Sequence, residues 1–224
     1  MEVNKILSMV DHTILKNTAT WEDIKQACDD GIRYGVACVC VPNCYVANAK
    51  KYVGDRVNIG SVTGFPYGYN TTEAKIFEAK KAIEDGADEI DMVLNIGWLK
   101  SGNFQAVEDE IKAIKEAVGN KTLKVIIETG VLTEEEKIAA CKIVTNAGAD
   151  FIKTSTGFTV GGATREDVKL FAENVGKGVR IKAAGGIKTL EAAEDFINLG
   201  ATRLGTSTLI KNIKGQKIEG SETY

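Results

Sequence analysis

Eight short runs rich in β-branched residues recur along the chain, and amphipathic stretches separate them. The runs are Met9–Thr13, Val36–Val41, Val57–Thr63, Glu89–Asn95, Leu123–Glu128, Phe151–Ser155, Val179–Ala184 and Arg203–Thr206. The helical patterns between them include Trp21–Arg33, Thr72–Asp85, Phe104–Val118, Glu134–Asn146, Arg165–Asn174 and Leu190–Asn198. Strand–helix alternation predicts parallel strands joined by crossover helices. For 224 residues and eight such units, the pattern predicts an α/β fold, a single (β/α)8 TIM barrel.

A degenerate repeat favours a barrel built from paired βα modules. Gly86-Ala87-Asp88, Gly148-Ala149-Asp150 and Gly200-Ala201-Thr202 each lie between a helical pattern and the next strand, and Gly35-Val36-Ala37 is a weaker copy. Helix starts are marked as well: Thr133 with Glu136 matches a capping box, and Thr20 with Asp23 and Thr164 with Asp167 resemble one. Because no Pro/Ser-rich linker interrupts the pattern, we expect one catalytic domain over residues 1–213 and a flexible C-terminal tail over residues 214–224.

Composition excludes several classes of function. The formal net charge is -3, with 44% hydrophobic and 26% charged residues, which is typical of a globular protein and lacks the basic stripe of a nucleic-acid binder. No apolar run approaches the roughly 20 residues that cross a bilayer. The first residues, Met1 to Leu7, carry no signal-peptide pattern. We therefore expect a cytoplasmic protein with neither a membrane nor a nucleic-acid partner.

Cysteine and histidine usage argues against a metal site and against a hydrolase. The five cysteines are Cys28, Cys38, Cys40, Cys44 and Cys141, and the single histidine is His12. A four-ligand zinc site is hard to assemble from this set, so we predict no metal and no cofactor, and interpret the cysteines as buried or half-buried reduced thiols. Ser–His or Cys–His chemistry needs a positioned base, which one histidine is poorly able to supply.

Three ionisable residues lie inside otherwise apolar predicted strands. They are Asp91, Lys153 and Lys182, in the fourth, sixth and seventh runs. Barrel active sites form at the C-terminal ends of the strands, and period-two alternation directs all three side chains to the inner face. For each residue alone, a lysine extending to solvent or an aspartate bonded to a loop is the commoner case. All three together favour a shared site.

Two lysines on adjacent strands suggest an activated amine. A second ammonium ~4 Å away costs roughly 4 kcal/mol at an effective dielectric near 20, which would lower one lysine pKa by ~3 units. An amine made neutral in this way attacks a carbonyl and forms a Schiff base. Asp91, which we expect one barrel radius away, would shuttle protons.

Glycine-rich loops follow the last predicted strands. Gly185-Gly186 follows the seventh, and Gly205-Thr206-Ser207-Thr208 follows the eighth, ahead of a short helix expected over Leu209–Ile213. Barrels often bind phosphate with these two loops, although a Gly-Gly pair alone is also an ordinary tight turn. The sixth loop adds Thr156-Gly157 and Gly161-Gly162, which form either a lid or a long turn.

At this point the sequence resembles a known family. The segments that carry the resemblance are Asp11-His12-Thr13, Glu89-Ile90-Asp91-Met92-Val93, Lys124 to Gly130, Phe151 to Phe158 and Ile181 to Ile187. They occur in the same order as in deoxyribose-phosphate aldolases, over nearly the whole chain. The resemblance implies reversible cleavage of 2-deoxy-D-ribose 5-phosphate into acetaldehyde and D-glyceraldehyde 3-phosphate, in deoxyribose phosphate catabolism.

The resemblance also assigns roles. It implies that Lys153 is the Schiff-base lysine, that Lys182 perturbs it and assists proton transfer, and that Asp91 is the proton donor and acceptor, working through water. The positions that match a phosphate site are Thr156, Gly157, Gly185, Gly186, Ser207 and Thr208, with Asp11 as a supporting polar residue and the terminal Tyr224 as a proton relay. Two positions depart from the family pattern: Phe158, where some relatives have lysine, and Leu209, where relatives often have glycine.

Two other classes of function share parts of this pattern. A phosphate-binding barrel isomerase or synthase would have the glycine loops without needing paired lysines, and a non-enzymatic barrel could sense a sugar phosphate. Trapping of an aldehyde on Lys153 by borohydride separates them from the aldolase. Barrels of this size are commonly dimers, so we expect a homodimer that acts on small phosphorylated sugars and aldehydes.

Overall fold

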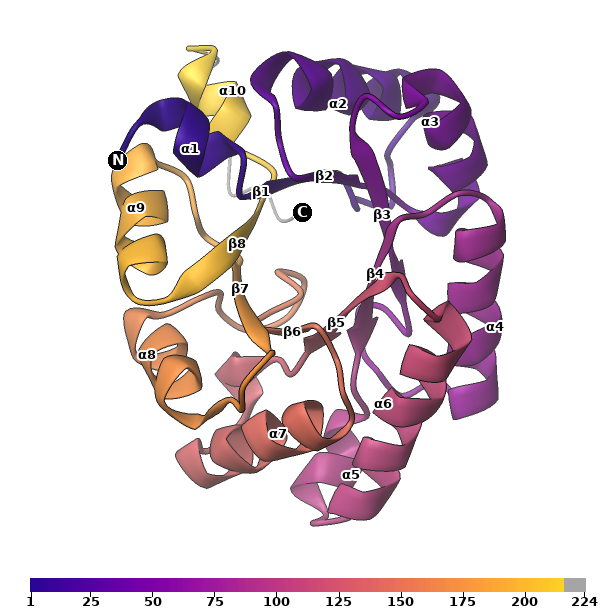
Figure 1. Cartoon of the computed structure of the whole chain (residues 1–224), viewed down its shortest axis with the longest axis vertical. Coiled ribbons are helices and arrows are strands. Elements are labelled where there is room, and N and C mark those ends of the chain that lie inside the picture. The colour runs from indigo at the N-terminus through magenta and orange to yellow at the C-terminus, as the bar shows by residue number, and fades with distance from the viewer. Residues whose placement is uncertain (216–224) are drawn as a thin grey trace.

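The computed structural model describes residues 1–215, which fold into one closed parallel barrel with its strands in sequence order. Figure 1 shows the helices forming a ring around the strands. The eight strands are β1 (Val10–Thr13), β2 (Cys38–Cys40), β3 (Asn58–Thr63), β4 (Glu89–Val93), β5 (Thr122–Ile126), β6 (Phe151–Lys153), β7 (Arg180–Ala184) and β8 (Ala201–Thr206). Because β1 pairs with β8 as well as with β2, the sheet has no edge. The predicted (β/α)8 architecture is confirmed.

The helices that cover the strands follow the amphipathic patterns of the sequence. They are α2 (Trp21–Tyr34), α4 (Thr72–Glu84), α6 (Phe104–Val118), α7 (Glu134–Asn146), α8 (Arg165–Asn174), α9 (Leu190–Asn198) and the short α10 (Leu209–Ile213). The sequence analysis missed α1 (Val3–Leu7), α3 (Val46–Val53) and α5 (Ile96–Lys100), and the 3-10 turns η1 (Asn43–Tyr45) and η2 (Thr129–Val131). Neither α1 nor α3 has a capping side chain, and α5 is a single turn, so each lacks a strong local signal.

Threonine caps begin several helices. The Thr20 and Thr133 hydroxyls accept hydrogen bonds from the backbone N–H groups of Asp23 and Glu136, and both helices complete the reciprocal capping box. The Thr164 hydroxyl accepts from the Asp167 N–H. The repeated glycines also have a structural cause: Gly148, for example, has a φ of 73° where α7 turns toward β6, a conformation that other L-residues rarely adopt.

Four strands, β2, β4, β5 and β6, end before their predicted runs do, and the early end of β6 matters most for the site. We predicted strands over Val36–Val41 and Phe151–Ser155, but the ladders cover Cys38–Cys40 and Phe151–Lys153. After Lys153 the chain leaves the sheet while remaining buried. The Thr154 hydroxyl lies 3.0 Å from both the carbonyl oxygen and the backbone nitrogen of Ala184, so it replaces ladder hydrogen bonds with side-chain ones.

The apolar core lies between the barrel wall and the helices. Residues such as Ile59, Ile90, Val125, Ile152 and Leu204 are fully buried there. Within residues 1–215 all five cysteines are free; Cys28, Cys38, Cys40 and Cys141 are buried as predicted, whereas Cys44 is exposed. No helix within residues 1–215 combines the length and the apolar character that crossing a membrane requires.

An ion pair outside the barrel anchors the end of β4. Lys75 Nζ lies 2.9 Å from Glu110 Oε1, and both side chains are fully buried between α4 and α6. Lys75 also donates to the Val93 carbonyl, and Glu110 accepts from the Asn95 N–H. Burial lowers the pKa of Lys75 and raises that of Glu110, while each partner opposes the shift of the other.

We expect Lys75→Met to destabilise the fold by about 3–5 kcal/mol, because it leaves a buried carboxylate without its partner. The double variant Lys75→Met/Glu110→Leu should recover much of that loss, since it removes both charges. Denaturant unfolding of the three proteins measures the difference. A loss below about 1 kcal/mol in the single variant would contradict a structural role for the pair.

Candidate active site

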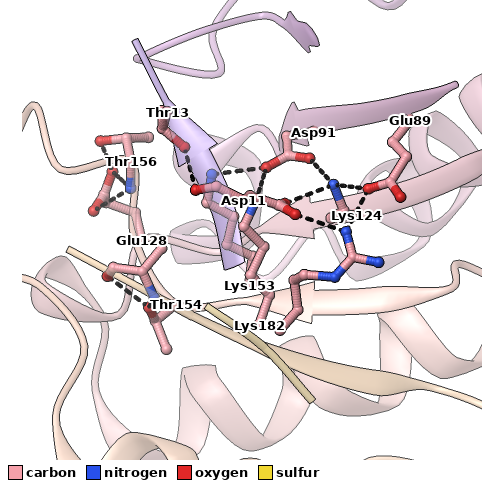
Figure 2. A network of polar contacts seen from close by, with 12 residues as sticks. Asp11, Thr13, Glu89, Asp91, Lys124, Glu128, Lys153, Thr154, Thr156 and Lys182 are labelled. Atoms are coloured by element: carbon pink, nitrogen blue, oxygen red, sulfur yellow. Dashed lines mark hydrogen bonds and ion pairs between the residues drawn. The ribbon is translucent and has the colours of Figure 1, made fainter. Parts of the chain in front are cut away.

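The inside of the barrel is filled by charged side chains instead of a purely apolar core. Figure 2 shows lysines and carboxylates from different strands pointing toward one another. All of them are buried or nearly so, and each charged group contacts a group of opposite charge. The set comprises Asp11 on β1, Glu89 and Asp91 on β4, Lys124 on β5, Lys153 on β6, Lys182 on β7 and Arg203 on β8.

The two lysines of the sequence prediction lie side by side. Lys153 and Lys182 are register partners on β6 and β7. Lys153 Nζ lies 2.8 Å from Asp91 Oδ2, and Lys182 Nζ lies 2.6 Å from the same oxygen. Two hydrogen bonds to one oxygen hold the nitrogens within about 5 Å of each other. The predicted shared cavity is therefore present.

Asp91 is closer to the lysines than we expected. The sequence analysis placed it one barrel radius away, whereas the structure has it in direct contact with Lys124, Lys153 and Lys182. Burial favours the protonated carboxyl, but the three lysines outweigh it, so the pKa of Asp91 lies well below its usual value. Long lysine side chains from β5, β6 and β7 reach across the narrow barrel and meet this carboxylate.

Lys153 and Lys182 have opposite electrostatic environments. The pKa of Lys153 is lowered, first by burial; Asp91 opposes this shift, and the Lys182 ammonium adds to it. Burial acts in the same way on Lys182, but Asp11 and Asp91 outweigh it and raise its pKa. Our sequence argument attributed the activation of Lys153 to repulsion by Lys182, and this weighting was wrong, because burial is the larger cause.

The sequence analysis did not single out three members of the network, Glu89, Lys124 and Arg203. Lys124 Nζ lies 2.6 Å from Glu89 Oε2, 2.8 Å from Asp91 Oδ1 and 3.0 Å from Asp11 Oδ2. Arg203 Nη1 lies 2.7 Å from both Glu89 Oε2 and Asp11 Oδ1. The signal that could have found Lys124 is its place inside the apolar run Leu123–Glu128, the same signal that identified Lys153. Lys182 also pairs with Asp11.

Counting charges identifies the lysine that can be neutral. Three carboxylates lie in the network, and Lys124, Lys182 and Arg203 balance them. Burial lowers the pKa of each of these cations, but the carboxylates outweigh it and raise all three. Lys153 is the fourth base, and a proton on it would leave the buried interior with an excess positive charge. The arrangement therefore favours Lys153 as the free amine.

Asp11, Cys38 and Glu89 also place three potential metal ligands within 4.8 Å of one another. Both carboxylates already bind Lys124 and Arg203. Burial raises the pKa of the Cys38 thiol well above its usual value, which disfavours the thiolate that a metal would require. These residues belong to the charge network, and we assign them no metal.

The three loops predicted to bind phosphate lie together. A Cβ on Gly162 would come within 2.6 Å of the Gly185 carbonyl oxygen, so the loops after β6 and β7 are in close contact. The Thr206 hydroxyl donates to the Ile187 carbonyl at 2.7 Å, which joins the loop after β7 to the last residue of β8. Gly186 is exposed and Ser207 is half-buried, so both lie where a ligand could approach.

Two of the predicted phosphate ligands are engaged elsewhere. The Thr156 hydroxyl and backbone N–H both donate to the Glu128 carboxylate, at distances of 2.6 to 3.3 Å. The Thr208 N–H donates to the Thr206 hydroxyl. Glu128 has a φ of 58°, a left-handed conformation that is rare outside glycine, and it ties the loop after β6 to the end of β5. The sequence analysis did not foresee this role for Glu128.

An apolar cluster borders the lysines. Leu15, Cys40 and Val62 pack together with the partly buried Phe65 and Phe158. The two aromatic rings meet edge to face, with centroids 5.2 Å apart. Burial raises the pKa of Cys40 to about 12, so its thiol stays protonated and packs as an apolar group.

Comparison with known families decides the identity of this site. The model of the DeoC/LacD family aldolases matches residues 5–212, which include every charged residue of the barrel interior. The chain belongs to the DeoC/LacD aldolase family. This aldolase is accordingly a carbon–carbon lyase, as the sequence resemblance implied.

Individual relatives agree with this assignment. The DeoC/LacD aldolase is 56% identical to a deoxyribose-phosphate aldolase of Clostridium botulinum (strain Alaska E43 / Type E3), over 96% of this chain and 98% of the relative. It is also 56% identical to one of Streptococcus agalactiae serotype Ia, over 98% of both chains. The solved deoxyribose phosphate aldolase from Aeropyrum pernix superposes with a TM-score of 0.85 at 28% identity, covering 95% of this chain and 92% of that one.

One predicted site residue of the aldolase cannot be placed. Tyr224, with residues 216–223 of the predicted tail, lies outside the described residues. Within the described part, α10 occupies the predicted range Leu209–Ile213, and Lys214 forms an ion pair with Asp30 of α2 at 2.9 Å.

Proposed function

We propose that the chain cleaves 2-deoxy-D-ribose 5-phosphate reversibly into acetaldehyde and D-glyceraldehyde 3-phosphate, through an imine on Lys153. The observation that carries this proposal is the charge balance of the barrel interior, which favours an uncharged amine on Lys153 alone. Relatives named deoxyribose-phosphate aldolase over nearly the whole chain support the choice of substrate.

The proposed cleavage begins with the neutral amine. Lys153 Nζ adds to the C1 aldehyde of the open-chain sugar, and loss of water gives a protonated imine. A base removes the C3 hydroxyl proton, the C2–C3 bond breaks, and its electron pair moves toward the iminium nitrogen to form an enamine. Glyceraldehyde 3-phosphate then leaves. Protonation of the enamine at C2 and addition of water release acetaldehyde and the free amine.

The neighbours of Lys153 supply the proton transfers in this proposal. Asp91 lies 2.8 Å from Lys153 Nζ, so its carboxylate can accept a proton at the reacting centre and, because its pKa is low, pass it on rather than retain it. Lys182 stays protonated beside it and provides an acid. Asp11 orients Lys182 by an ion pair. We propose Tyr224 as a further relay.

We propose that the substrate phosphate binds at the clustered glycine loops. Gly185, Gly186 and Ser207 would contact it through backbone N–H groups and the serine hydroxyl, with Gly157 on the neighbouring loop. Thr156 and Thr208 would shape these loops through their own hydrogen bonds. Phe158 adds no positive charge here, so the backbone would provide most of the phosphate contacts.

Release of acetaldehyde from 2-deoxy-D-ribose 5-phosphate tests the function. An NADH-dependent alcohol dehydrogenase can follow the product, with ribose 5-phosphate and unphosphorylated deoxyribose as comparison substrates. We expect the phosphorylated deoxy sugar to be preferred and the activity to survive chelation by EDTA, because the imine mechanism requires no metal. Absence of acetaldehyde with the folded protein would refute the proposal.

Removal of the Lys182 charge should suppress activity at neutral pH. In Lys182→Met, the Asp91 carboxylate keeps its contact with Lys153 but a neighbouring positive charge is lost, so the pKa of Lys153 should rise by about two units. The neutral amine then forms only at higher pH, and the acidic limb of the kcat/KM profile should move upward. An unshifted limb in the folded variant would refute this coupling.

Location and assembly remain expectations that accompany this function. We propose a cytoplasmic homodimer that binds no nucleic acid. The net charge of -3 argues against nucleic-acid binding, and the small size of the barrel is common among dimers. Light scattering at micromolar concentration measures the assembly, and a monomer there would contradict the dimer.

A further inference from the structure

Arg203 and Glu89 belong to the charge network but are joined to Lys153 only through other residues. Arg203 Nη1 bridges Glu89 Oε2 and Asp11 Oδ1, each at 2.7 Å. The guanidinium also lies 5.2 Å from the centre of the Phe151 ring. Its side chain is 12% exposed and that of Glu89 is 5% exposed, so water screens neither charge well. Both charges therefore act on the interior at low dielectric.

A chain of contacts joins this pair to Lys153. Arg203 binds Asp11, Asp11 binds Lys182, and Lys182 shares the Asp91 Oδ2 atom with Lys153. On β4, Glu89 is linked to Asp91 through Lys124 of the neighbouring β5, which contacts both carboxylates. Each contact joins groups of opposite charge, so removal of the charge on Arg203 or Glu89 changes the electrostatic potential at Lys153.

The surroundings of Lys153 contain few other titratable groups. The Cys38 and Cys40 thiols face the network from β2, and burial raises the pKa of both, so they remain neutral. No residue of β3, Asn58–Thr63, is titratable. Burial lowers the pKa of His12 on β1 to about 4, so it is neutral, and Arg180, the first residue of β7, is exposed and lies over the Phe151 ring. The buried charged groups on the remaining strands are Asp11 on β1, Glu89 and Asp91 on β4, Lys124 on β5, Lys182 on β7 and Arg203 on β8. Three are negative and three are positive.

We propose that Arg203 and Glu89 are positioning residues with opposite effects: the buried Arg203 cation favours the uncharged Lys153 amine, the buried Glu89 carboxylate opposes it, and the balance of the two sets the pH at which that amine forms. This inference rests on the imine role proposed above for Lys153. Neither residue needs to touch the substrate. They affect the reaction through the electrostatic potential that their charges create at Lys153.

The proposal predicts opposite effects from two single variants. Arg203→Met leaves the interior with an excess negative charge, which a proton on Lys153 would balance, so imine formation should require higher pH. Glu89→Gln leaves an excess positive charge and should move imine formation to lower pH. A unit charge roughly 10 Å away at an effective dielectric near 20 shifts a pKa by about one unit. The double variant restores the balance and should return close to the original profile.

Single-turnover imine formation with acetaldehyde measures these shifts directly. The adduct is reduced with cyanoborohydride at a series of pH values, and peptide mapping by mass spectrometry locates and quantifies it. We expect the midpoint to rise by about one pH unit in Arg203→Met, to fall by a similar amount in Glu89→Gln, and to stay unchanged in the charge-preserving control Arg203→Lys. Circular dichroism monitors folding. If Arg203→Met does not fold, the isosteric Glu89→Gln carries the test alone.

Two kinds of failure are distinguishable. Midpoints that do not move, that move in the same direction in both single variants, or that fail to return in the double variant would overturn this inference while leaving the adduct on Lys153. A wild-type adduct on another lysine would overturn the proposed function itself, and this inference with it.

Discussion

Replacing Lys153 by methionine should lower kcat for deoxyribose 5-phosphate cleavage by roughly 10⁴-fold or more, because no other group can form the covalent intermediate. The fold should persist. Since Lys153 is the base that the network leaves neutral, its loss changes no charge balance, and only its contact with Asp91 is removed. Methionine has a similar length and suits a site that is 5% exposed.

The assay of this prediction compares activity with stability. Lys137→Met is a matched control, since that lysine pairs with Asp167 on the outer helices and lies apart from the barrel interior. We expect the control to retain activity and the Lys153 variant to keep its unfolding midpoint within a few degrees, as an effect of about 1 kcal/mol would give. Activity of Lys153→Met within tenfold of the wild type would refute the assignment.

Asp91→Asn should impair both catalysis and folding. The carboxylate accepts hydrogen bonds from three buried lysines, so an amide leaves an excess positive charge in the interior and should cost about 3–5 kcal/mol of stability. Loss of the proton-transfer group should lower kcat by roughly 10²- to 10⁴-fold. Kinetics and denaturant unfolding measure the two effects separately.

The prediction for Asp91→Asn includes the direction in which stability changes with pH. Burial opposes ionisation of Asp91, but its lysine partners lower its folded-state pKa well below the usual value of 3.8. The unfolded chain therefore binds the proton more readily, so the stabilisation is present above about pH 4 and is lost as the pH falls further. The asparagine variant should lack this part of the acid sensitivity. Equal acid sensitivity of the two proteins, or unchanged kcat, would contradict the role given to Asp91.

Sequence periodicity predicted the fold more completely than it predicted the active site. Alternation in the strands placed Asp91, Lys153 and Lys182 on the inner face, and threonine caps located the starts of α2 and α7. These signals are local, so a sequence displays them directly. The direct contact of Asp91 with three lysines is not local. It depends on how side chains from strands far apart in sequence cross the closed barrel.

Other features could not be predicted because they depend on backbone geometry or on a balance of large effects. Thr156 matched a phosphate ligand by position, but the left-handed Glu128 brings a carboxylate to its hydroxyl. For Lys153, the sequence suggested repulsion by Lys182, whereas the degree of burial, which only the folded structure reveals, is the first cause of its lowered pKa.

The central claim is that Lys153 is the one uncharged amine among the buried bases and forms the imine. Incubation with acetaldehyde at neutral pH, reduction with borohydride and peptide mapping test it most directly. We predict a single two-carbon adduct on Lys153, with Lys124 and Lys182 unmodified because they remain ammonium ions. An adduct on Lys182 or Lys124, or none on the folded protein, would contradict the claim.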